Sequence, residues 1–531
     1  MLSIRRFAPV LAVSLAFLIP PGLAAVAAPG SADAGNTNAA PASHGYLPLH
    51  PDYPQVKAQA DAIAQAKAQG SGPLKGGHGG GGGTAPSTTN PDGGWEGVFQ
   101  TTVTPPDSTG AAGPNDYIEL VNDQYGIYTK TGTPLASGPL SDLFVHTGIS
   151  NGALSDPQIL WDPETSRFYY VAIDTTSGNF ALLYGFTKTS NWTDGFCSYR
   201  ALPYGSTLPD YPKLGDMAGY LLVGVNDFDN ASTYNHSEVA WITKQAKGEI
   251  TCPASAGYAG QIPLAVPATP VPAVQADTAS TSTTPGYVVQ ATDVSGSSGA
   301  HSNQLIVTSI TNPATTSPSI TTAKPNVADY YLPSNAPQYG TSKRLDTLDG
   351  RLEHAVEVGD VVYTAHAVAK ASGGISEERW YAIDAGGNIV GHGTLGDTSL
   401  YVFNGAISPD LSGSNLVLGV STSGANAYPA MQAVKWAASD PTNPPPNPPL
   451  VTVAASTLTN PTSVIEQSPT YNYDFSCSGR QSVCRWGDYS GASPDPSGSG
   501  GVFLSNQYNV GGGSIFQAAW RTRNILITPT P

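Results

Sequence analysis

The sequence predicts an all-β protein, and three observations support this fold class. Charged residues make up only 12% of the 531 residues, whereas 40% are hydrophobic, so enough apolar material for a large core is present. The 59 glycines and 46 prolines would interrupt helix interiors, which disfavours a helical bundle. Short stretches of apolar and aromatic alternation recur along the chain, as half-buried strands require. Together these features predict many short strands joined by turns.

The acidic charge excludes two classes of partner. The chain has 23 Lys and Arg against 39 Asp and Glu, a net charge of −16. Sequence-independent nucleic-acid binding needs basic residues that displace counterions from phosphates. Anionic membranes likewise attract basic segments. We therefore expect neither nucleic acid nor a membrane surface as a partner.

Residues 1–27 have the features of a secretory signal peptide. Arg5 and Arg6 give a positive start, Val10–Leu18 is apolar, and Ala25-Val26-Ala27 fits a cleavage site. The apolar run is shorter than the roughly 20 residues that a membrane span needs. We therefore expect a secreted, extracellular mature chain without a transmembrane span.

Residues 28–95 are rich in Ala, Gly, Ser and Pro and include the glycine run Gly79–Gly83. Such a composition cannot bury enough apolar surface to offset the entropy of ordering. The sequence predicts a disordered N-terminal linker here, with a short helix over 53–69.

Four cysteines in an exported chain indicate disulfides. Three pairings are open, and pairing of sequence neighbours is favoured, Cys197 with Cys252 and Cys477 with Cys484. The chain contains no Cys-x-x-Cys pair, which argues against a zinc site made of these thiols.

A pair of predicted strands recurs seven times, and the first strands of successive pairs start 51 to 86 residues apart. Turn residues separate the two members of each pair, as hairpins require. The pairs are Tyr117–Val121 with Tyr125–Thr129, Phe168–Asp174 with Phe180–Thr187, Tyr220–Asn226 with Glu238–Thr243, Tyr287–Thr292 with Gln304–Ser309, Val361–Ala367 with Arg379–Ile383, Asn415–Ser421 with Tyr428–Lys435, and Gly501–Gln507 with Ser514–Arg521.

A polar residue precedes each first strand by 10 to 13 residues, which leaves room for another, inner strand. A unit of about four strands repeated seven times is typical of a β-propeller. We predict a single seven-bladed propeller over residues 96–528, although six or eight blades would also fit, and two β-sandwiches are the alternative. Inner strands of a propeller line a central channel, where we expect the recurring residues to gather: Asp107, Asp156, Asp210, Asp277, Arg351, Asn404 and Asp488.

Several segments resemble those of a widespread group of exported bacterial proteins that look like sialidase-type propellers and have no assigned reaction. The resemblance covers most of residues 95–525 and implies fold and export. The segments are Pro105-Pro106-Asp107-Ser108-Thr109-Gly110-Ala111-Ala112-Gly113-Pro114, Asp156-Pro157-Gln158-Ile159-Leu160-Trp161-Asp162, Asp210-Tyr211-Pro212-Lys213-Leu214-Gly215, and Arg485-Trp486-Gly487-Asp488-Tyr489-Ser490 with Asp495-Pro496.

A true sialidase assignment is weak. Sialidases carry repeated Ser-x-Asp-x-Gly-x-x-Trp boxes, and the nearest segment, Ser408–Gly413, lacks the Trp. They also grip a carboxylate with three arginines. Arg344, Arg351 and Arg485 could be proposed, but their spacing does not require it.

Paired carboxylates are the first candidates for chemistry. A glycosidase uses one protonated and one ionised carboxyl group, and mutual repulsion can raise the pKa of one of them. If they converge, Asp107, Asp156, Asp210 and Asp488 could be catalytic in this way. The alternative is structural, because Asp before Pro or Tyr often closes a turn through its side chain.

Metal and histidine chemistry are weaker candidates. Ca²⁺ is a possible cofactor, but Asp227-Phe228-Asp229-Asn230 lacks the Gly and Glu of a calcium loop, and a solvated turn fits it better. His354 and His366 flank Tyr363 near Arg351, a set that could abstract a proton as polysaccharide lyases do. Buried histidines satisfied by the backbone are the alternative.

The sequence is thus consistent with two functions. The first is a monomeric, non-catalytic propeller that binds an extracellular glycan, peptide or surface protein at its channel mouth. The second is a carbohydrate-active hydrolase or lyase. Beyond the four aspartates, the residues expected to bind the ligand are Tyr211, Arg351, His366, Asn404, Arg485, Trp486 and Tyr489.

Overall fold

The computed structural model describes residues 94–99, 103–149, 154–176, 178–231, 233–264, 269–277, 284–292, 294, 301–315, 318–439, 464–468, 470–477, 482–511 and 518–528. These residues belong to one compact unit. The predicted signal peptide, residues 1–27, and the predicted helix over 53–69 lie outside the described residues. Trp95, the last residue of the predicted linker, is already part of a strand.

The described chain is almost entirely β-structure, as predicted, and most of it forms four-stranded antiparallel sheets. The first three sheets follow one another along the chain, each as a meander of consecutive strands. They consist of β2 (Thr109–Ala112), β3 (Asp116–Val121), β4 (Gln124–Thr129) and β5 (Pro134–Pro139); β6 (Leu154–Asp162), β7 (Arg167–Asp174), β8 (Phe180–Thr187) and β9 (Phe196–Gly205); and β10 (Thr207–Met217), β11 (Tyr220–Asp229), β12 (Thr233–Thr243) and β13 (Ala259–Pro263).

The middle of the chain is less regular and forms a ten-stranded sheet. Within it, β14 (Val271–Pro272), β16 (Gly286–Ala291), β17 (His301–Thr311) and β18 (Ser319–Ala323) pair in order, and so do β22 (His354–Val358), β23 (Val361–Ala369), β24 (Ser376–Asp384) and β25 (Ile389–Leu395). The sheet also includes β15 (Val274–Gln275), which pairs with β22, and β19 (Asn326–Tyr331), which pairs with both β17 and β23.

Two further four-stranded sheets and a small three-stranded sheet complete the fold. They comprise β26 (Tyr401–Pro409), β27 (Asn415–Gly424), β28 (Ala427–Ala437) and β29 (Val464–Gln467); β31 (Gly491–Pro494), β32 (Val502–Asn509), β33 (Trp520–Ile527) and β1 (Trp95–Glu96); and β20 (Ala336–Pro337), β21 (Arg344–Leu345) and β30 (Val483–Cys484). Short 3-10 helices are η1 (Leu140–Thr147), η2 (Trp192–Asp194) and η3 (Phe475–Cys477).

The predicted strand pairs match the observed strands except for the last one. The second strand of that pair was predicted over Ser514–Arg521, whereas β33 runs over Trp520–Ile527. The prediction was wrong at its C-terminal end, because β33 pairs with β32 along its whole length, from Trp520 opposite Asn509 to Ile527 opposite Val502, and local alternation does not reveal this register. Residues 514–517 of the predicted strand lie outside the described residues. The inner strand predicted ahead of each pair is present in all seven places, as β2, β6, β10, β14, β22, β26 and β31.

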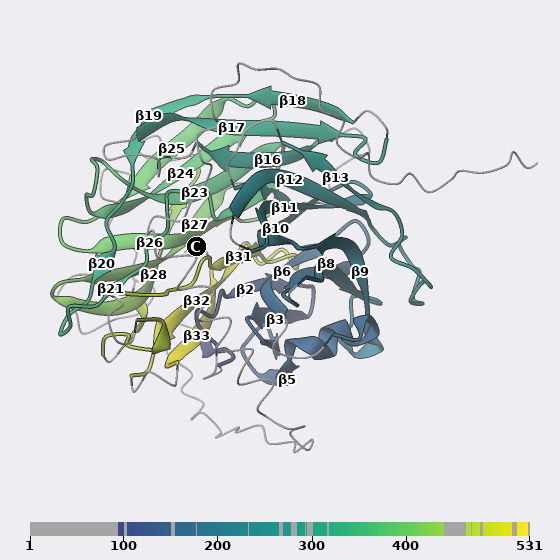
Figure 1. Ribbon diagram of the computed structural model, residues 1–531, viewed down its shortest axis with the longest axis horizontal. Coiled ribbons are helices and arrows are strands. Elements are labelled where there is room, and N and C mark those ends of the chain that lie inside the picture. The colour runs from purple at the N-terminus through teal and green to yellow at the C-terminus, as the bar shows by residue number, and fades with distance from the viewer. Residues whose placement is uncertain are drawn as a thin grey trace, which may run out of the picture. The chain divides into compact units, whose positions relative to one another are not determined.

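The first strands of successive sheets contact one another, and β31 of the last sheet contacts β2 of the first. In Figure 1 the yellow strands of the C-terminus accordingly lie beside the purple strands that begin the fold. Apolar side chains fill the space between these sheets. Phe503 of β32, for example, stacks on Tyr117 of β3 with 5.1 Å between ring centroids. Burial of such rings drives the association of neighbouring sheets.

Three of the first strands share a β-bulge near their start. The bulges lie between Ser155 and Gln158, between Asp210 and Lys213, and between Phe403 and Ala406. Each contains a residue in the left-handed region, Asp156 (φ 53°), Tyr211 (φ 57°) and Asn404 (φ 56°). Tyr211, and not the predicted Asp210, therefore occupies the position equivalent to Asp156. Asp-Pro spacing alone cannot locate a bulge, and a shift of one residue exchanges the two faces of a strand.

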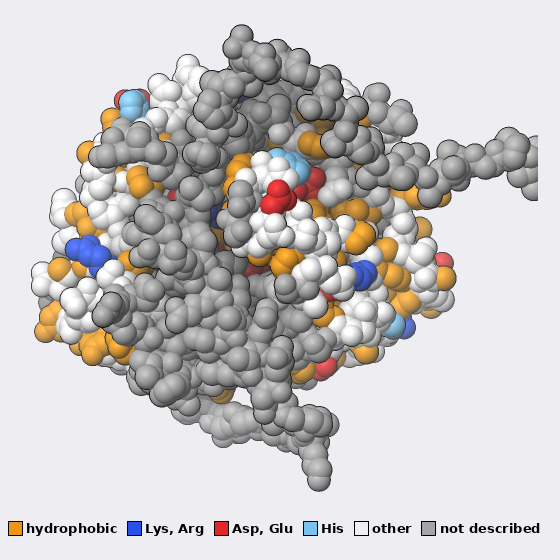
Figure 2. Space-filling view, viewed as in Figure 1, with side chains coloured by type: hydrophobic (Ala, Val, Ile, Leu, Met, Phe, Trp, Pro, Cys, Tyr) orange, Lys and Arg blue, Asp and Glu red, His pale blue; other side chains and the backbone are white. Residues whose placement is uncertain are grey.

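The low charge of the chain is visible on its surface, where Figure 2 shows scattered acidic and basic side chains among apolar and neutral ones. No helix within the described ranges is long and apolar enough to cross a membrane.

Candidate functional site

A narrow cavity is lined by the first strands of several sheets. Its walls come from β2, β6, β10, β15, β22 and β31, with side chains that include Leu160, Leu214 and Val356. It encloses about 30 Å³ of free space, enough for a water molecule or two. The predicted inner strands thus do surround a common space, but one too small for a sugar ring.

Five charged side chains gather where these strands begin, and we call them the central charge cluster: Asp107, Asp156, Lys213, Glu353 and Asp488. The ammonium group of Lys213 experiences the charges of all four carboxyl groups. Each of the five residues is at most 2% exposed. The sequence therefore correctly predicted that Asp107, Asp156 and Asp488 converge, but they converge in the interior.

Two tyrosines hold Lys213 between them. Its Nζ lies 3.5 Å from the ring centroid of Tyr489 and 4.2 Å from that of Tyr211, within the range of cation–π attraction. The Tyr211 hydroxyl donates to the backbone oxygen of Asp488 at 2.7 Å, and the Tyr489 hydroxyl donates to that of Pro157 at 3.0 Å. Burial lowers the pKa of Lys213 to about 7, because the rings and carboxylates replace water only in part.

The aspartates of the cluster accept hydrogen bonds from the protein itself. Asp107 accepts from the backbone N–H of Asp488 at 2.7 Å and from the Asn122 side chain at 2.8 Å. Asn122 also accepts from the backbone N–H of Asp156 at 2.8 Å. Arg485 donates to both carboxylate oxygens of Asp488, at 2.8 and 2.7 Å. Burial, and next the negative charges of Asp488 and Asp156, raise the pKa of Asp107 well above its usual value.

The other predicted ligand-binding residues are also buried. Arg351 pairs with Asp349, its Nε lying 2.6 Å from the carboxylate, and stacks over Tyr211 with its guanidinium carbon 4.5 Å from the ring centroid. Asn404 donates to Asn506 at 3.3 Å, and Trp486 donates to Ser421 at 3.0 Å. Their side chains therefore connect neighbouring sheets and do not face solvent.

Asp210 and Asp277 are placed apart from the cluster. Asp210 is buried in the β10 bulge, one residue before the position equivalent to Asp156. Asp277 accepts from the backbone N–H of Gly359 at 2.8 Å, in the turn between β22 and β23. The Asp277 carboxylate therefore has a structural role in this turn.

The predicted histidine set does not form a proton-transfer site. His366 contacts the backbone oxygen of Gly350 at 2.8 Å and the Tyr381 hydroxyl at 3.1 Å, and burial lowers its pKa to about 3. His354 contacts the backbone oxygen of Ile407 at 3.1 Å. Tyr363 stands three residues before His366 on β23, so the two point to opposite faces of the sheet. His366 is thus a buried histidine with both ring nitrogens in contact with partners, whereas His354 is half-buried and lines the cavity.

Sequence reasoning missed Lys213, Glu353 and Glu378. Within the part of the chain that the structure describes, both carboxylate oxygens of Glu353 and of Glu378 are buried without a hydrogen-bond partner, and burial raises both pKa values well above the usual range. Lys213 stood inside a motif that the sequence already marked, directly after Pro212. A lysine on a predicted inner strand, in a chain with so few charges, was the signal that could have found it.

Two other buried acids predict how stability depends on pH. Burial raises the pKa of Glu357 to about 7 and that of Asp216 to about 6. Their folded pKa values exceed the unfolded ones, so their stabilisation is complete below about pH 4 and is lost as pH rises toward 7. These two groups alone should make the free energy of unfolding on the order of 2–4 kcal/mol higher at pH 5 than at pH 7, whereas buried His366, whose pKa is lowered to about 3, acts in the opposite direction.

Urea titrations at the two pH values measure this difference. Glu357→Gln removes one of the titrating groups and should flatten the dependence. A difference between pH 5 and pH 7 that is the same in Glu357→Gln and in the unmodified chain would contradict the assignment.

Four tyrosines lie near the three-stranded sheet, three of them on loops and one at the start of β28. The tyrosine patch consists of Tyr339, which is 49% exposed, and the half-buried Tyr428, Tyr471 and Tyr473. Tyr339 and Tyr428 meet edge to face with centroids 5.2 Å apart. The ammonium of Lys343 lies 5.7 Å from the Tyr473 ring centroid.

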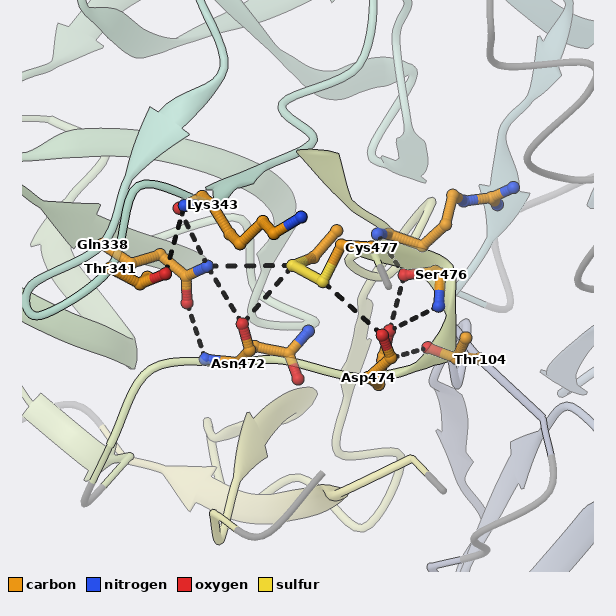
Figure 3. The surroundings of a disulfide bond; sticks show 10 residues. Thr104, Gln338, Thr341, Lys343, Asn472, Asp474, Ser476 and Cys477 are labelled. Atoms are coloured by element: carbon orange, nitrogen blue, oxygen red, sulfur yellow. Dashed lines mark hydrogen bonds between the residues drawn. A yellow bond between two sulfur atoms is a disulfide. The ribbon is translucent and has the colours of Figure 1, made fainter. Parts of the chain in front are cut away.

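A disulfide and a side-chain amide hold these loops together. Gln338 accepts from the backbone N–H of Asn472 at 2.6 Å and donates to its backbone oxygen at 3.2 Å. Figure 3 shows Gln338 reaching across to Asn472 next to the Cys477–Cys484 bond, with Asp474 between Ser476 and Thr104. Both predicted disulfides, this one and Cys197–Cys252, are present. The tyrosine patch is thus carried on tethered loops.

Comparisons with known proteins give only distant structural likeness. No protein-family model matches the chain. No curated protein matches its sequence. Among solved structures, it is similar to the Trypanosoma rangeli sialidase in complex with 2,3-difluorosialic acid, with 8% identity, a TM-score of 0.34, and coverage of 76% of this chain and 56% of the sialidase. The chain therefore spans little more than half the length of that enzyme.

Two further structures have similar scores. The subtype N10 neuraminidase-like protein of A/little yellow-shouldered bat/Guatemala is 8% identical, with a TM-score of 0.35 and coverage of 65% of this chain and 99% of that one. A quinonprotein alcohol dehydrogenase-like protein from Bacteroides thetaiotaomicron is 12% identical, with a TM-score of 0.33 and coverage of 62% and 63%. Likeness at this level does not assign an activity to the chain.

Proposed function

We propose that this protein is an exported, non-catalytic seven-bladed β-propeller that binds an extracellular glycan through the tyrosine patch. One observation carries the proposal. The carboxylates expected to be catalytic are buried among protein donors, whereas Tyr339 of the tyrosine patch is 49% exposed and the other three tyrosines are half-buried.

The blade count is supported by how the strands pair. Five separate four-stranded sheets and two four-stranded runs within the ten-stranded sheet make seven units. Pairing of β1 with β33 joins the start of the domain to its last sheet, a closure that favours a ring over two sandwiches. Export is supported by the signal-like residues 1–27 and by the two disulfides.

Glycan is favoured over the other extracellular ligands by the chemistry of the patch. A tyrosine ring offers a flat apolar face that can cover a sugar ring, and its hydroxyl offers a hydrogen bond at the edge. Lys343 adds a positive charge beside Tyr473, which suits an acidic sugar unit. The tethered loops lower the entropy lost on binding, because less of the surface has to be ordered.

Retention on insoluble polysaccharides tests the proposal. The secreted protein is mixed with chitin, cellulose, xylan and peptidoglycan, and bound protein and released sugars are both measured. We expect retention on at least one of these without sugar release, and an affinity about fivefold lower for Tyr339→Ala, which loses roughly 1 kcal/mol of ring contact. Tyr258→Ala is the matched control, because Tyr258 is 79% exposed and lies outside the patch.

The alternative function is a carbohydrate-active enzyme, favoured by the perturbed pKa values of Lys213, Asp107 and Glu353 in one cluster. It predicts sugar release that falls sharply in Asp156→Asn and Asp488→Asn. Such a result would replace the binding proposal. If Tyr339→Ala is retained as well as the unmodified chain, the ligand does not bind at the tyrosine patch.

A further inference from the structure

Strands β11 and β12 bring three side chains with metal-binding atoms onto one face. Asp227 of β11 is the cross-strand partner of His236 on β12, and Glu238 follows two residues after His236. Side chains two residues apart on a strand share a face, and directly opposed residues also share one. Antiparallel pairing therefore places a carboxylate, an imidazole and a second carboxylate together.

The distances between these groups suit a small divalent cation. His236 Nε2 lies 3.2 Å from Asp227 Oδ2 and 3.5 Å from Glu238 Oε2. One ligand atom from each residue falls within 4.8 Å of the other two. Zinc bonds to nitrogen and oxygen are about 2.0–2.2 Å, so neighbouring ligands of a tetrahedral zinc ion lie roughly 3.3–3.5 Å apart. The nitrogen is already at this distance from both carboxylates.

A second observation points to a missing partner. The Asp227 side chain is 3% exposed, and its Oδ1 is buried without a hydrogen-bond partner among the described residues, while Oδ2 faces His236. A buried polar atom without a partner is costly, and a cation would satisfy it.

Surrounding residues hold Glu238 in a ligating orientation. The Tyr204 hydroxyl donates to Glu238 Oε1 at 2.6 Å, and the Gln261 amide donates to the same oxygen at 2.7 Å. The other oxygen, Oε2, is left facing His236. Hydrogen bonds of this kind orient the carboxylate ligands of metal sites and tune their affinity.

Solvent can reach the site through the histidine. His236 is 38% exposed, and Figure 2 shows acidic side chains next to a histidine on the viewed face, over the region of β10–β12 in Figure 1. We propose that Asp227, His236 and Glu238 bind a zinc-type divalent ion, with a fourth position open to water or an outside ligand. An imidazole ligand favours zinc over calcium, which takes oxygen ligands.

This site differs from the calcium fragment considered at Asp227-Phe228-Asp229-Asn230. Asp229 accepts hydrogen bonds from Thr207 at 3.2 Å and Asn235 at 3.3 Å. The decisive ligands come from the next strand, so a linear calcium-loop pattern could not reveal them. The site is also independent of the tyrosine patch and of glycan binding.

Calorimetric titration of the chelator-treated full chain with Zn²⁺ tests the proposal. We expect one Zn²⁺ per chain, and binding more than about 100-fold weaker in His236→Ala, since loss of an outer partner alone typically costs 10- to 100-fold. Tyr204→Phe leaves the three ligands in place and should weaken binding about tenfold. Co²⁺ bound in place of Zn²⁺ should give the visible absorption of a low-coordinate site.

His392→Ala is the matched control, because His392 is exposed on β25 outside the three-residue group. It should bind Zn²⁺ like the unmodified chain. Unchanged Zn²⁺ affinity in His236→Ala, binding of Ca²⁺ in preference to Zn²⁺, or no Zn²⁺ binding at all would each overturn the proposal. If His236→Ala does not fold, Tyr204→Phe with the Co²⁺ spectrum decides the question.

Discussion

Replacing Lys244 with methionine is expected to lower the free energy of unfolding by about 3–5 kcal/mol. The ammonium group lies 2.8 Å from Asp216, 3.0 Å from Asp162 and 2.9 Å from Glu164. Lys244 is 3% exposed and the two aspartates are 1% exposed. Removing the only lysine in this group leaves two buried carboxylates facing each other, which costs more than the pair contributes when intact.

Urea unfolding of Lys244→Met at pH 8 measures this loss. Lys370→Met is the control, because Lys370 pairs with Glu377 but is 77% exposed and should cost under about 0.5 kcal/mol. At pH 5 the loss should shrink, since Asp216, whose pKa burial already raises to about 6, can then be protonated. A loss below 1 kcal/mol, or one independent of pH, would show that the ion pairs of Lys244 contribute little to the stability of the contact between the second and third sheets.

Removing the Cys197–Cys252 disulfide is expected to cost about 4 kcal/mol, against about 2.4 kcal/mol for Cys477–Cys484. The two bonds span 55 and 7 residues. A longer closed loop restricts the unfolded chain more strongly, so its loss costs more in the chain-entropy model. Cys197 of β9 is tied to the segment after β12, so this bond also links the second sheet to the third.

Double alanine variants of each pair, unfolded without reductant, give the two values. Adding dithiothreitol to the unmodified chain should reproduce the sum of the two losses. A larger loss for the shorter loop would mean that its contacts with Gln338 and Asn472, and not chain entropy, dominate its contribution.

The strands were predictable because their signal is local. Alternation with a period of two marks a strand whatever its neighbours are, and the pairs around Phe168, Tyr220 and Val361 match the observed strands. The prediction was wrong at β33, where the register with β32, which extends to Ile527 opposite Val502, sets the end of the strand. The disulfide pairing was also predictable, because sequence neighbours in a small set of cysteines left few choices.

The site was predictable only in part. The polar residues that recur ahead of each strand pair were expected to gather, and Asp107, Asp156 and Asp488 do lie together. The prediction was wrong for Asp277, which closes a turn. It was one residue off at Asp210, because the bulge in β10 places Tyr211 at the position equivalent to Asp156. Spacing along the chain measures how far a residue is from a strand, but not which way a bulge turns its side chain.

What the sequence by itself determined about this protein is its all-β class, its repeated strand pairs and its two disulfides. Only the tertiary structure decided which polar side chains meet. Asp107 and Asp488 are hydrogen-bonded although 381 residues separate them, and Asp227 meets His236 through the register of β11 and β12. Such contacts arise from pairing and packing between segments, so no local pattern of residues contains them. Because of these contacts, residues that were expected at an open channel mouth form a buried network. The tyrosine patch and the Asp227 group are the sites that remain to be tested for binding.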